Sequence, residues 1–315
     1  MKILPLQGID IKRFGYSLLA FLTVLTIIVM PSCQKTDVGK RQTIIVTYSI
    51  LGSVVKELVG DKADVIVSIP NGLDPHEWDP SARSIEAVNK SALVIRNGLG
   101  LEAGMERCLK SAEDRGVKIF TASDHITVRH VGPGEGIPAG DPDQAVGAPD
   151  PHLWTDPIMM KGIVEALVPV LKKELNIDAA DRASDMESRL DDLDRQISDA
   201  VSAIPPENRK LVTGHESMGY LAQRYGFKLI GVIVPGLSSQ AGVSAADLNT
   251  LKDVIQKTRV KAIFTELGTS SAIARAIGDE TGVKVVELKT HALPTDGSYF
   301  TYVKDMVDTI TNALK

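Results

Sequence analysis

A single amphipathic segment near the middle of the chain constrains the fold more than any other feature. Apolar residues recur there at spacings of three and four, with charged residues between them, at Ala183, Met186, Leu190, Leu193, Ile197, Val201 and Ile204. The pair Pro205-Pro206 ends the pattern, because proline cannot continue helical hydrogen bonding. We therefore predict one helix of about 25 residues, roughly 37 Å long, which is enough to span a small domain.

Short apolar runs alternate with helical patterns on both sides of this segment. Runs of about five residues between helical patterns favour parallel strands that are covered on both faces. They lie at residues 43–49, 65–69, 92–96 and 117–121 before the long helix, and at 210–213, 228–234, 262–266 and 283–288 after it. Helical patterns lie at residues 158–175, 248–258 and 272–281. The fold class that follows is α/β, with two similar α/β lobes containing parallel sheets, joined by one long rigid helix.

These patterns divide the chain into five segments. We expect a signal segment at residues 1–33, a flexible tether at 34–42, an N-terminal lobe at 43–177, a linking helix at 178–205 and a C-terminal lobe at 206–315. Ligands of such folds bind at the carboxyl ends of the strands, so we expect the binding site in the cleft between the lobes. Residues 129–151, rich in glycine, proline and aspartate, predict a surface loop.

The composition excludes several classes of protein. The 315 residues include 35 Lys plus Arg and 40 Asp plus Glu, a net charge of −5, which argues against a nucleic-acid-binding protein. Two cysteines cannot form a disulfide framework or a cysteine-rich zinc module. No glycine-rich phosphate loop with Lys-Ser/Thr is present, so an ATPase activity would belong to another chain.

The N-terminal residues predict export. Lys12 and Arg13 precede an uncharged run at residues 16–30, which is shorter than a membrane span of about 20 residues and typical of a signal peptide. Ser32-Cys33 after this run resembles a bacterial lipoprotein processing site, at which Cys33 becomes the lipidated first residue. An ordinary cleaved signal or an uncleaved anchor is the alternative. The other cysteine, Cys108, is then expected to be a buried, inert thiol.

A short motif that contains a histidine between two prolines occurs twice and uses both tryptophans of the chain. It reads Asp-Pro-His-Glu-Trp-Asp-Pro at residues 74–80 and Asp-Pro-His-Leu-Trp-Thr-Asp-Pro at residues 150–157. Flanking prolines restrict the backbone and thereby order the imidazole in advance, which favours metal binding. We therefore predict His76 and His152 as metal ligands. The alternative is a pair of unrelated Asp-Pro turns with helix-capping aspartates.

Two further histidines follow predicted strands directly. His215 follows residues 210–213 and His291 follows residues 283–288, so both are expected at the cleft. A core or capping histidine is the alternative for His215, and an exposed loop histidine is the alternative for His291. Glu266 ends another strand and is either a ligand or an acceptor that holds an imidazole N–H. Asp296 is interpreted first as a carboxylate that orders its loop.

Four protein ligands, two from each lobe, would clamp the lobes around an ion and leave no coordination position for water. Catalytic zinc needs such an open position, so the pattern favours binding over catalysis. A zinc hydrolase with Glu216 or Glu77 as general base is the enzymatic alternative, but the zinc-protease motif His-Glu-x-x-His is absent. His125 and His130 are expected to be solvated, with a transient metal relay as the alternative.

At these residues the sequence resembles the metal-binding solute-binding proteins of bacterial ABC transporters, the zinc/manganese class called cluster A-I. The resemblance covers about residues 43–315 and is carried by residues 49–51, 59–61, 70–78, 97–102, 150–154 and 220–226. It implies a monomeric metal receptor, not an enzyme, that acts in the periplasm or at the cell surface. It further implies a lipid anchor in the membrane, a membrane permease as partner and a separate ATPase.

The resemblance also implies a ligand set. His76 and His152 match the two ligands of the N-terminal lobe, and His215 falls on the third position, which is histidine in zinc binders and often glutamate in manganese binders. The family usually has aspartate where His291 stands, so His291 is the expected fourth ligand, with Glu266 and Asp296 as substitutes.

The donor set bears on the identity of the ion and on its pH dependence. Imidazole suits zinc whereas manganese prefers oxygen ligands, so Zn²⁺ is expected. A Mn²⁺ or Fe²⁺ receptor of the same class and a metal-stabilised surface adhesin are the alternatives. Because histidine must be neutral to bind a metal, affinity is expected to fall as the pH drops through about 6.5.

Overall fold

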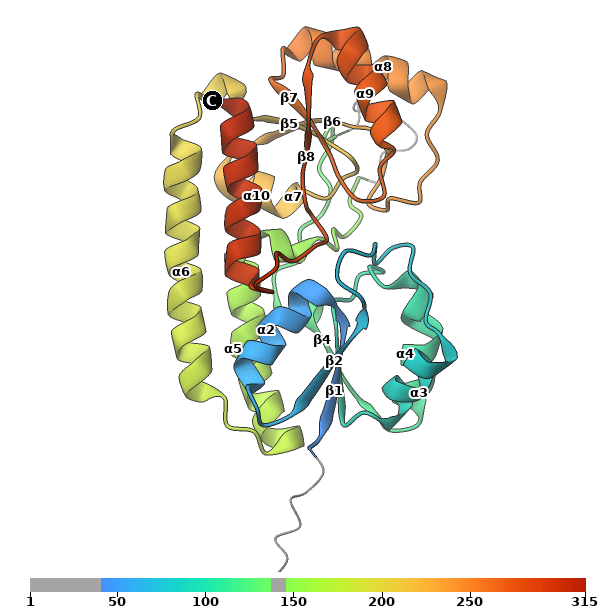
Figure 1. Cartoon of the computed structure of the whole chain (residues 1–315), viewed down its shortest axis with the longest axis vertical. Helices are drawn as coiled ribbons and strands as arrows, with labels where there is room; N and C mark the ends of the chain where they lie inside the picture. Colours follow the sequence, from blue (N-terminus) through green and yellow to red (C-terminus); the bar gives the residue numbers. More distant parts are fainter. Residues whose placement is uncertain (1–40, 137–145) are drawn as a thin grey trace, which may run out of the picture. The chain divides into compact units, whose positions relative to one another are not determined.

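The computed structural model describes residues 41–136 and 146–315, which include both predicted lobes (Figure 1). In the first lobe the described strands form a parallel sheet in the order β2-β1-β3-β4. Their bounds are β1 (Thr43–Tyr48), β2 (Asp64–Ile69), β3 (Leu93–Arg96) and β4 (Lys118–Thr121). The central strand β1 is buried from Ile44 to Tyr48, as expected for a strand covered on both faces.

Helices cover both faces of this sheet (Figure 1). They are α2 (Ser49–Val59), α3 (Ala82–Lys90), α4 (Glu106–Asp114) and α5 (Pro157–Leu175), with the short 3₁₀ helices η1 (Ala103–Met105), η2 (Ala122–His125) and η3 (Leu153–Thr155). Helices α2 and α5 lie on one side, and α3 and α4 lie on the other. Helix α5 begins at Pro157 because Asp156 caps its first turn, where its carboxylate accepts from the N–H of Ile158 at 2.8 Å.

The predicted long helix is α6 (Ala180–Ser202), with 23 residues. Its buried residues are those of the apolar periodicity, but the helix ends at Ser202, so that Ile204 is buried beyond its end. Helix α6 packs along α5 and along α10 (Tyr299–Leu314), which the sequence analysis did not predict (Figure 1). The connection between the lobes is therefore part of a packed helical layer.

In the second lobe, the described strands pair as two parallel ribbons, β5 with β6 and β7 with β8, rather than as one continuous hydrogen-bonded sheet. The strands are β5 (Lys210–Thr213), β6 (Lys228–Val232), β7 (Ala262–Thr265) and β8 (Lys284–Glu287), and β5 lies next to β7. The helices are η4 (Pro206–Asn208), α7 (Gly219–Tyr225), α8 (Ala245–Thr258) and α9 (Ser271–Thr281). Helix α8 begins at a reciprocal capping box between Ser244 and Asp247.

Two apolar clusters stabilise this arrangement. The larger one runs from the first sheet through α5, α6 and α10 to Phe264 and Leu288 of the second lobe. The smaller one lies under α8 and α9 and includes Val212, Ile233 and Ile263. Because the larger cluster includes residues of both lobes, the strand ends that carry the candidate site are anchored to the same core.

Several predictions about the chain's ends and segments lie partly outside this structure. Cys33, the predicted signal segment and most of the tether lie outside the described residues. The lobe boundaries stay predictions, although α6 occupies most of the predicted linking segment. Cys108 is a buried free thiol, as predicted, and burial raises its pKa. Among residues 41–136 and 146–315, no helix is both long and apolar enough to cross a membrane.

Candidate metal centre

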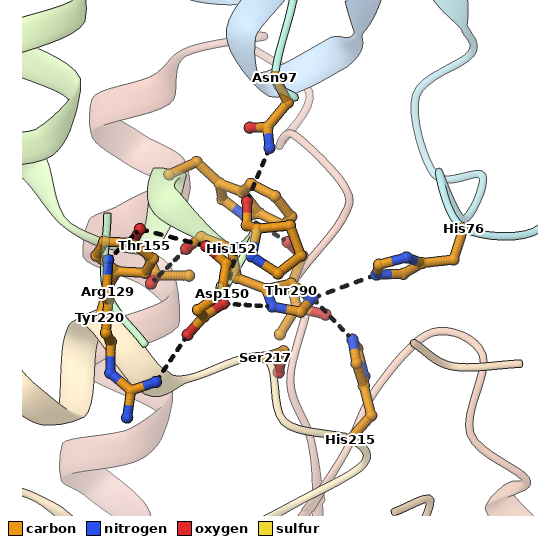
Figure 2. Close-up of polar contacts among 12 residues, drawn as sticks. His76, Asn97, Arg129, Asp150, His152, Thr155, His215, Ser217, Tyr220 and Thr290 are labelled. Carbon is orange, nitrogen blue, oxygen red and sulfur yellow. Dashed lines mark hydrogen bonds and ion pairs between the residues drawn. The ribbon is translucent and has the colours of Figure 1, made fainter. Parts of the chain in front are cut away.

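Four buried histidines from both lobes converge on one point, and three of them are labelled in Figure 2. His76 lies in the loop after β2, and His152 lies directly before η3. His215 follows β5 and His291 follows β8, at the strand ends where the sequence predicts them. Each offers one ring nitrogen, and the four nitrogens lie within 4.8 Å of one another.

The spacing of these nitrogens is that of a metal site. Nε2 of His152 lies 3.2 Å from Nε2 of His76 and 3.1 Å from Nε2 of His215. In a tetrahedral site with Zn–N distances of about 2.0–2.1 Å, neighbouring nitrogens are about 3.3 Å apart. The arrangement therefore matches the tetrahedral spacing at two of its edges before any ion is considered.

The repeated Asp-Pro-His motif has one structural purpose in both copies. The carboxylate of Asp74 accepts from the backbone N–H of His76 at 2.9 Å, and the carboxylate of Asp150 accepts from that of His152 at the same distance. Each aspartate thus closes a turn two residues long, which aims the histidine into the cleft. The repetition in the sequence reflects this shared turn.

Asp150 also holds the imidazole of its own histidine. Its Oδ1 lies 2.9 Å from Nδ1 of His152, and its Oδ2 lies 3.1 Å from Nη1 of Arg129 (Figure 2). Both carboxylate oxygens are fully buried with the imidazole. This contact assigns the proton of neutral His152 to Nδ1, so that the lone pair of Nε2 faces the other histidines.

Glu266 provides the equivalent anion for the second lobe. Its carboxylate accepts from the backbone N–H of His215 at 3.0 Å and from the hydroxyl of Ser217 at 2.8 and 2.9 Å. Nδ1 of His215 lies 3.3 Å from Oε1 of Glu266, without a well-aligned hydrogen bond. Glu266 therefore lies behind His215 and outside the cluster of converging nitrogens, and it accepts from the backbone N–H of His215 rather than from its imidazole.

The two groups of this pair shift each other's protonation. Burial alone would raise the pKa of Glu266, but the neighbouring His215 lowers it to about 2, so the carboxylate is ionised. Burial alone would lower the pKa of His215, but Glu266 raises it above the usual value of 6.5. His215 is consequently the histidine of the cluster that retains a proton most readily.

The other three histidines are neutral over the physiological range. Burial, followed by the neighbouring His152, lowers the pKa of His76 to about 2. Burial and the neighbouring His215 lower the pKa of His291 to about 3. Burial also lowers the pKa of His152, against the opposing effect of Asp150. The sequence-based expectation that affinity falls below about pH 6.5 assumes the usual pKa of histidine, and for these three histidines the pKa is lower.

The remaining candidates lie elsewhere. Asp296 is exposed and accepts from Ser298 N–H at 3.0 Å and from the Thr301 hydroxyl at 2.7 Å, so it orders the start of α10. His125 is exposed and stacks on Phe120, with ring centroids 4.4 Å apart.

His130 is also exposed, and its backbone pairs with Pro149 in the loop that the sequence predicts at residues 129–151. Residues 137–145 of that loop lie outside the described part of the chain. Like Asp296 and His125, His130 does not belong to the histidine cluster found among the described residues.

Two positioning contacts were missed by the sequence reasoning. The side-chain N–H of Asn97 donates to the carbonyl of Pro151 at 2.9 Å and so fixes the peptide before His152 (Figure 2). Nε1 of Trp154 donates to the carbonyl of Thr290 at 3.1 Å, which ties the motif of the first lobe to the peptide before His291. No local pattern signals either bond, because each joins residues more than 50 positions apart.

Comparison with known proteins agrees with this geometry. The manganese-binding lipoprotein MntA of Halalkalibacterium halodurans is 25% identical over 308 residues, which cover 94% of this chain and 97% of MntA. The zinc-binding lipoprotein AdcA of Streptococcus pneumoniae is 27% identical over 278 residues, which cover 85% of this chain and 53% of AdcA.

A solved structure confirms the predicted two-lobe α/β fold. The periplasmic zinc-binding protein TroA from Treponema pallidum matches with a TM-score of 0.76 at 25% identity, over 87% of this chain and 99% of TroA.

The sequence profile of the family described as zinc-uptake complex component A, periplasmic, matches residues 44–313. That description is of a transport component, which confirms the predicted class of protein and the expectation that it is not an enzyme. Because the match spans most of the 315 residues, the chain belongs to the zinc-uptake complex component A family.

Proposed function

We propose that this protein binds one divalent transition-metal ion, zinc in the first place, through His76, His152, His215 and His291. It then delivers the ion to an ABC permease for uptake, with a separate ATPase driving transport. The bound ion is the cargo of the protein. The two ligands from each lobe hold the lobes together around the ion until it is passed on.

One observation carries the proposal: ring nitrogens of four buried histidines converge within 4.8 Å of one another, as the ligands of a metal ion do. Asp150 assigns the proton of His152 to Nδ1, and its Nε2 lies 3.1 and 3.2 Å from the Nε2 atoms of two other histidines. Nitrogen lone pairs at this distance repel one another unless a proton or a metal ion lies between them, and one ion at the centre would satisfy all four nitrogens at once. Nε2 of His291 is also buried and has no hydrogen-bond partner among the described residues, as is suitable for a ligand atom.

The donor set supports zinc over manganese. Four imidazoles, without a carboxylate among the nitrogens of the cluster, are borderline-soft ligands that suit zinc. Manganese is the second candidate, because the similar MntA lipoprotein is named for that metal, and iron(II) is a third member of the same class of cargo. Glu266 and Asp150 lie behind the imidazoles, so they supply negative charge near the ion without presenting oxygen to it.

The cellular setting completes the proposal. We place the protein outside the cytoplasm, tethered to the membrane through a lipidated Cys33 and acting as a monomer. The names of the MntA and AdcA relatives, both lipoproteins, support this setting. Mass spectrometry of the membrane-extracted protein tests it, since a diacylated N-terminal Cys33 is the expected species and an unmodified one contradicts it.

Competition calorimetry on the chain from Gln34 onward, stripped of metal with a chelator, tests the proposed cargo. We expect one zinc ion per chain at sub-micromolar Kd, bound far more tightly than manganese. His291→Ala should weaken zinc binding, whereas His125→Ala is the matched control, because His125 is an exposed histidine outside the cluster. Equal affinity in the two variants would remove His291 from the site, and tighter manganese binding would overturn the choice of zinc.

A further inference from the structure

The loop that carries His76 is attached to the opposite lobe at three places. His76 itself meets the histidines of the second lobe. The side-chain amide of Asn71 donates to the carbonyl of Leu293 at 3.0 Å and accepts from its N–H at 2.7 Å. Asp74 accepts from the hydroxyl of Ser239 at 2.6 Å.

The contact between Asp74 and Ser239 is buried and continuous with the ligand. Asp74 is 7% exposed and Ser239 is 6% exposed. Oδ2 of Asp74 accepts from Ser239, while Oδ1 of the same carboxylate accepts from the backbone N–H of His76 at 2.9 Å. One carboxylate therefore joins a serine of the second lobe to the backbone of a histidine of the first.

Gly268 provides the space for this contact. Its φ of +80° is unfavourable for other residues, and a Cβ at this position would lie 2.5 Å from Oδ2 of Asp74 and 2.6 Å from Cβ of Ser239. Any larger residue would push the two partners apart. The turn after β7 is thus shaped around the contact between the lobes.

The two copies of the Asp-Pro-His motif differ at this point. In the copy with His152, the second oxygen of Asp150 pairs with Arg129. Both residues precede the linking helix in the sequence, so both belong to the first lobe. In the copy with His76, the second oxygen of Asp74 is satisfied from the other lobe. Hence the carboxylate of Asp74 has both of its partners only when the lobes are together, whereas the carboxylate of Asp150 has its partners within its own lobe.

We propose that Asp74 and Ser239 form a clasp that couples lobe closure to the position of His76, with Ser239 as a positioning residue that sets how long the ion stays bound. The inference rests on the proposed metal-binding function. When the lobes separate, Asp74 loses Ser239, the turn that aims His76 loosens, and the ion loses a ligand on the side that opens. Closure reverses these steps.

The position of the clasp fits a role in release. A pocket of about 460 Å³ is lined by His291 and Glu266. Gly72 of the His76 loop and Gly268 both line it. The clasp, which packs against Gly268, therefore lies beside a pocket that one of the candidate ligands lines.

The test measures the rate of zinc dissociation from the chain that starts at Gln34, by stopped flow into an excess of a chromogenic chelator. Ser239→Ala should release zinc about tenfold faster, which corresponds to about 1.4 kcal/mol, because one buried hydrogen bond of the closed state is lost. Ser238→Ala is the matched control, because Ser238 is the adjacent serine and accepts only a local bond from Gln240 N–H. The urea midpoint of the metal-free protein should be the same in both variants.

A second pair of variants tests the clasp through the backbone. Gly268→Ala should also accelerate release, because the added methyl group separates Asp74 from Ser239. Gly282→Ala is its control, since Gly282 has a similar φ of +72° but nothing within 4 Å of an added Cβ. This control carries the same backbone strain without touching the clasp.

The outcomes separate this inference from the proposed function. If the parent chain binds no zinc, the proposed function is wrong. If the parent binds zinc but Ser239→Ala and Gly268→Ala release it no faster than their controls, the clasp is wrong and the receptor function stands. Faster release in Ser239→Ala and in Gly268→Ala than in their respective controls, with each variant as stable as its control in the metal-free state, supports the clasp.

Discussion

Replacing Glu266 with glutamine is the most informative single change at the metal centre. Glutamine keeps the shape of the side chain and one carbonyl oxygen for Ser217 and for the backbone of His215. It removes the negative charge that lies 3.3 Å from Nδ1 of His215. The substitution therefore isolates the electrostatic contribution of Glu266 from its contribution to packing.

The substitution changes the affinity for zinc in two ways, which have opposite signs. At high pH, loss of the anion behind a ligating histidine should weaken zinc binding by about 10–100-fold, or about 1.4–2.8 kcal/mol. At lower pH the same anion favours the proton, because Glu266 raises the pKa of His215. The variant lowers that pKa, so zinc no longer has to displace a proton from His215.

The pH dependence can be worked out from the four histidines. His76 and His291 have pKa values lowered to about 2 and about 3, so these two release no proton on binding zinc above pH 5, and the pKa of His152 is also lowered. His215 alone has a raised pKa. In the parent protein, Kd should therefore rise about tenfold per pH unit below the pKa of His215, which corresponds to one proton per ion. In Glu266→Gln, Kd should stay nearly constant over the same range.

Competition calorimetry or a fluorescent zinc indicator between pH 8 and pH 5 measures both effects. The ratio of Kd in Glu266→Gln to Kd in the parent should be about 10–100 at pH 8 and should shrink as the pH falls. Ser217→Ala is the control, because it removes a hydroxyl donor to Glu266 but keeps the charge, so its pH profile should follow that of the parent. A ratio independent of pH, or release of three to four protons per ion by the parent, would refute the reasoning.

Three further outcomes are expected. Asp296→Asn should leave zinc affinity and stoichiometry unchanged in calorimetry, because its carboxylate orders the start of α10; a loss of affinity would restore it as a candidate ligand. Between neutral pH and pH 5, the unfolding free energy of the metal-free protein should fall by about 2 kcal/mol for each of His76 and His291. The reason is that the pKa values of both histidines are lowered in the folded protein, whereas in the unfolded chain they take up protons below about pH 6.5. Identical urea midpoints at pH 7.5 and pH 5 would contradict this. Asn97→Ala should lower the unfolding free energy by about 1–3 kcal/mol, because it leaves a buried carbonyl without its donor, and thermal unfolding measures the change.

The sequence predicts those parts of the fold that repeat along the chain. The positions at which α6 is buried are those of the apolar periodicity, and β5 has the predicted bounds. Helix α10 was missed, although its buried face packs on α6, because no strand follows it to mark an alternation. The pairing of the second-lobe strands as two separate ribbons was also missed, because the sequence of a strand does not specify which other strand it pairs with.

The four candidate ligands could also be predicted from local sequence, but the contacts that position them could not. His215 and His291 follow strands directly, and His76 and His152 share a motif, so local sequence is sufficient to single them out. The contacts of Ser239 with Asp74 and of Trp154 with Thr290 join segments more than 130 positions apart. Such contacts depend on how the lobes pack, which no local pattern encodes.

The distribution of charge explains how a site of neutral ligands can hold a divalent ion and still release it. The four imidazoles carry no negative charge when neutral, but each lobe places one buried carboxylate behind one of its histidines, Asp150 in the first lobe and Glu266 in the second. With the lobes together, a bound ion would be near both anions, and its charge of +2 would be balanced in part, because Asp150 is also paired with Arg129. When the lobes separate, the ion can stay near only one of them, and the remaining imbalance favours its departure. In the proposed receptor, opening the cleft therefore lowers the affinity for the ion both by removing ligands and by removing charge.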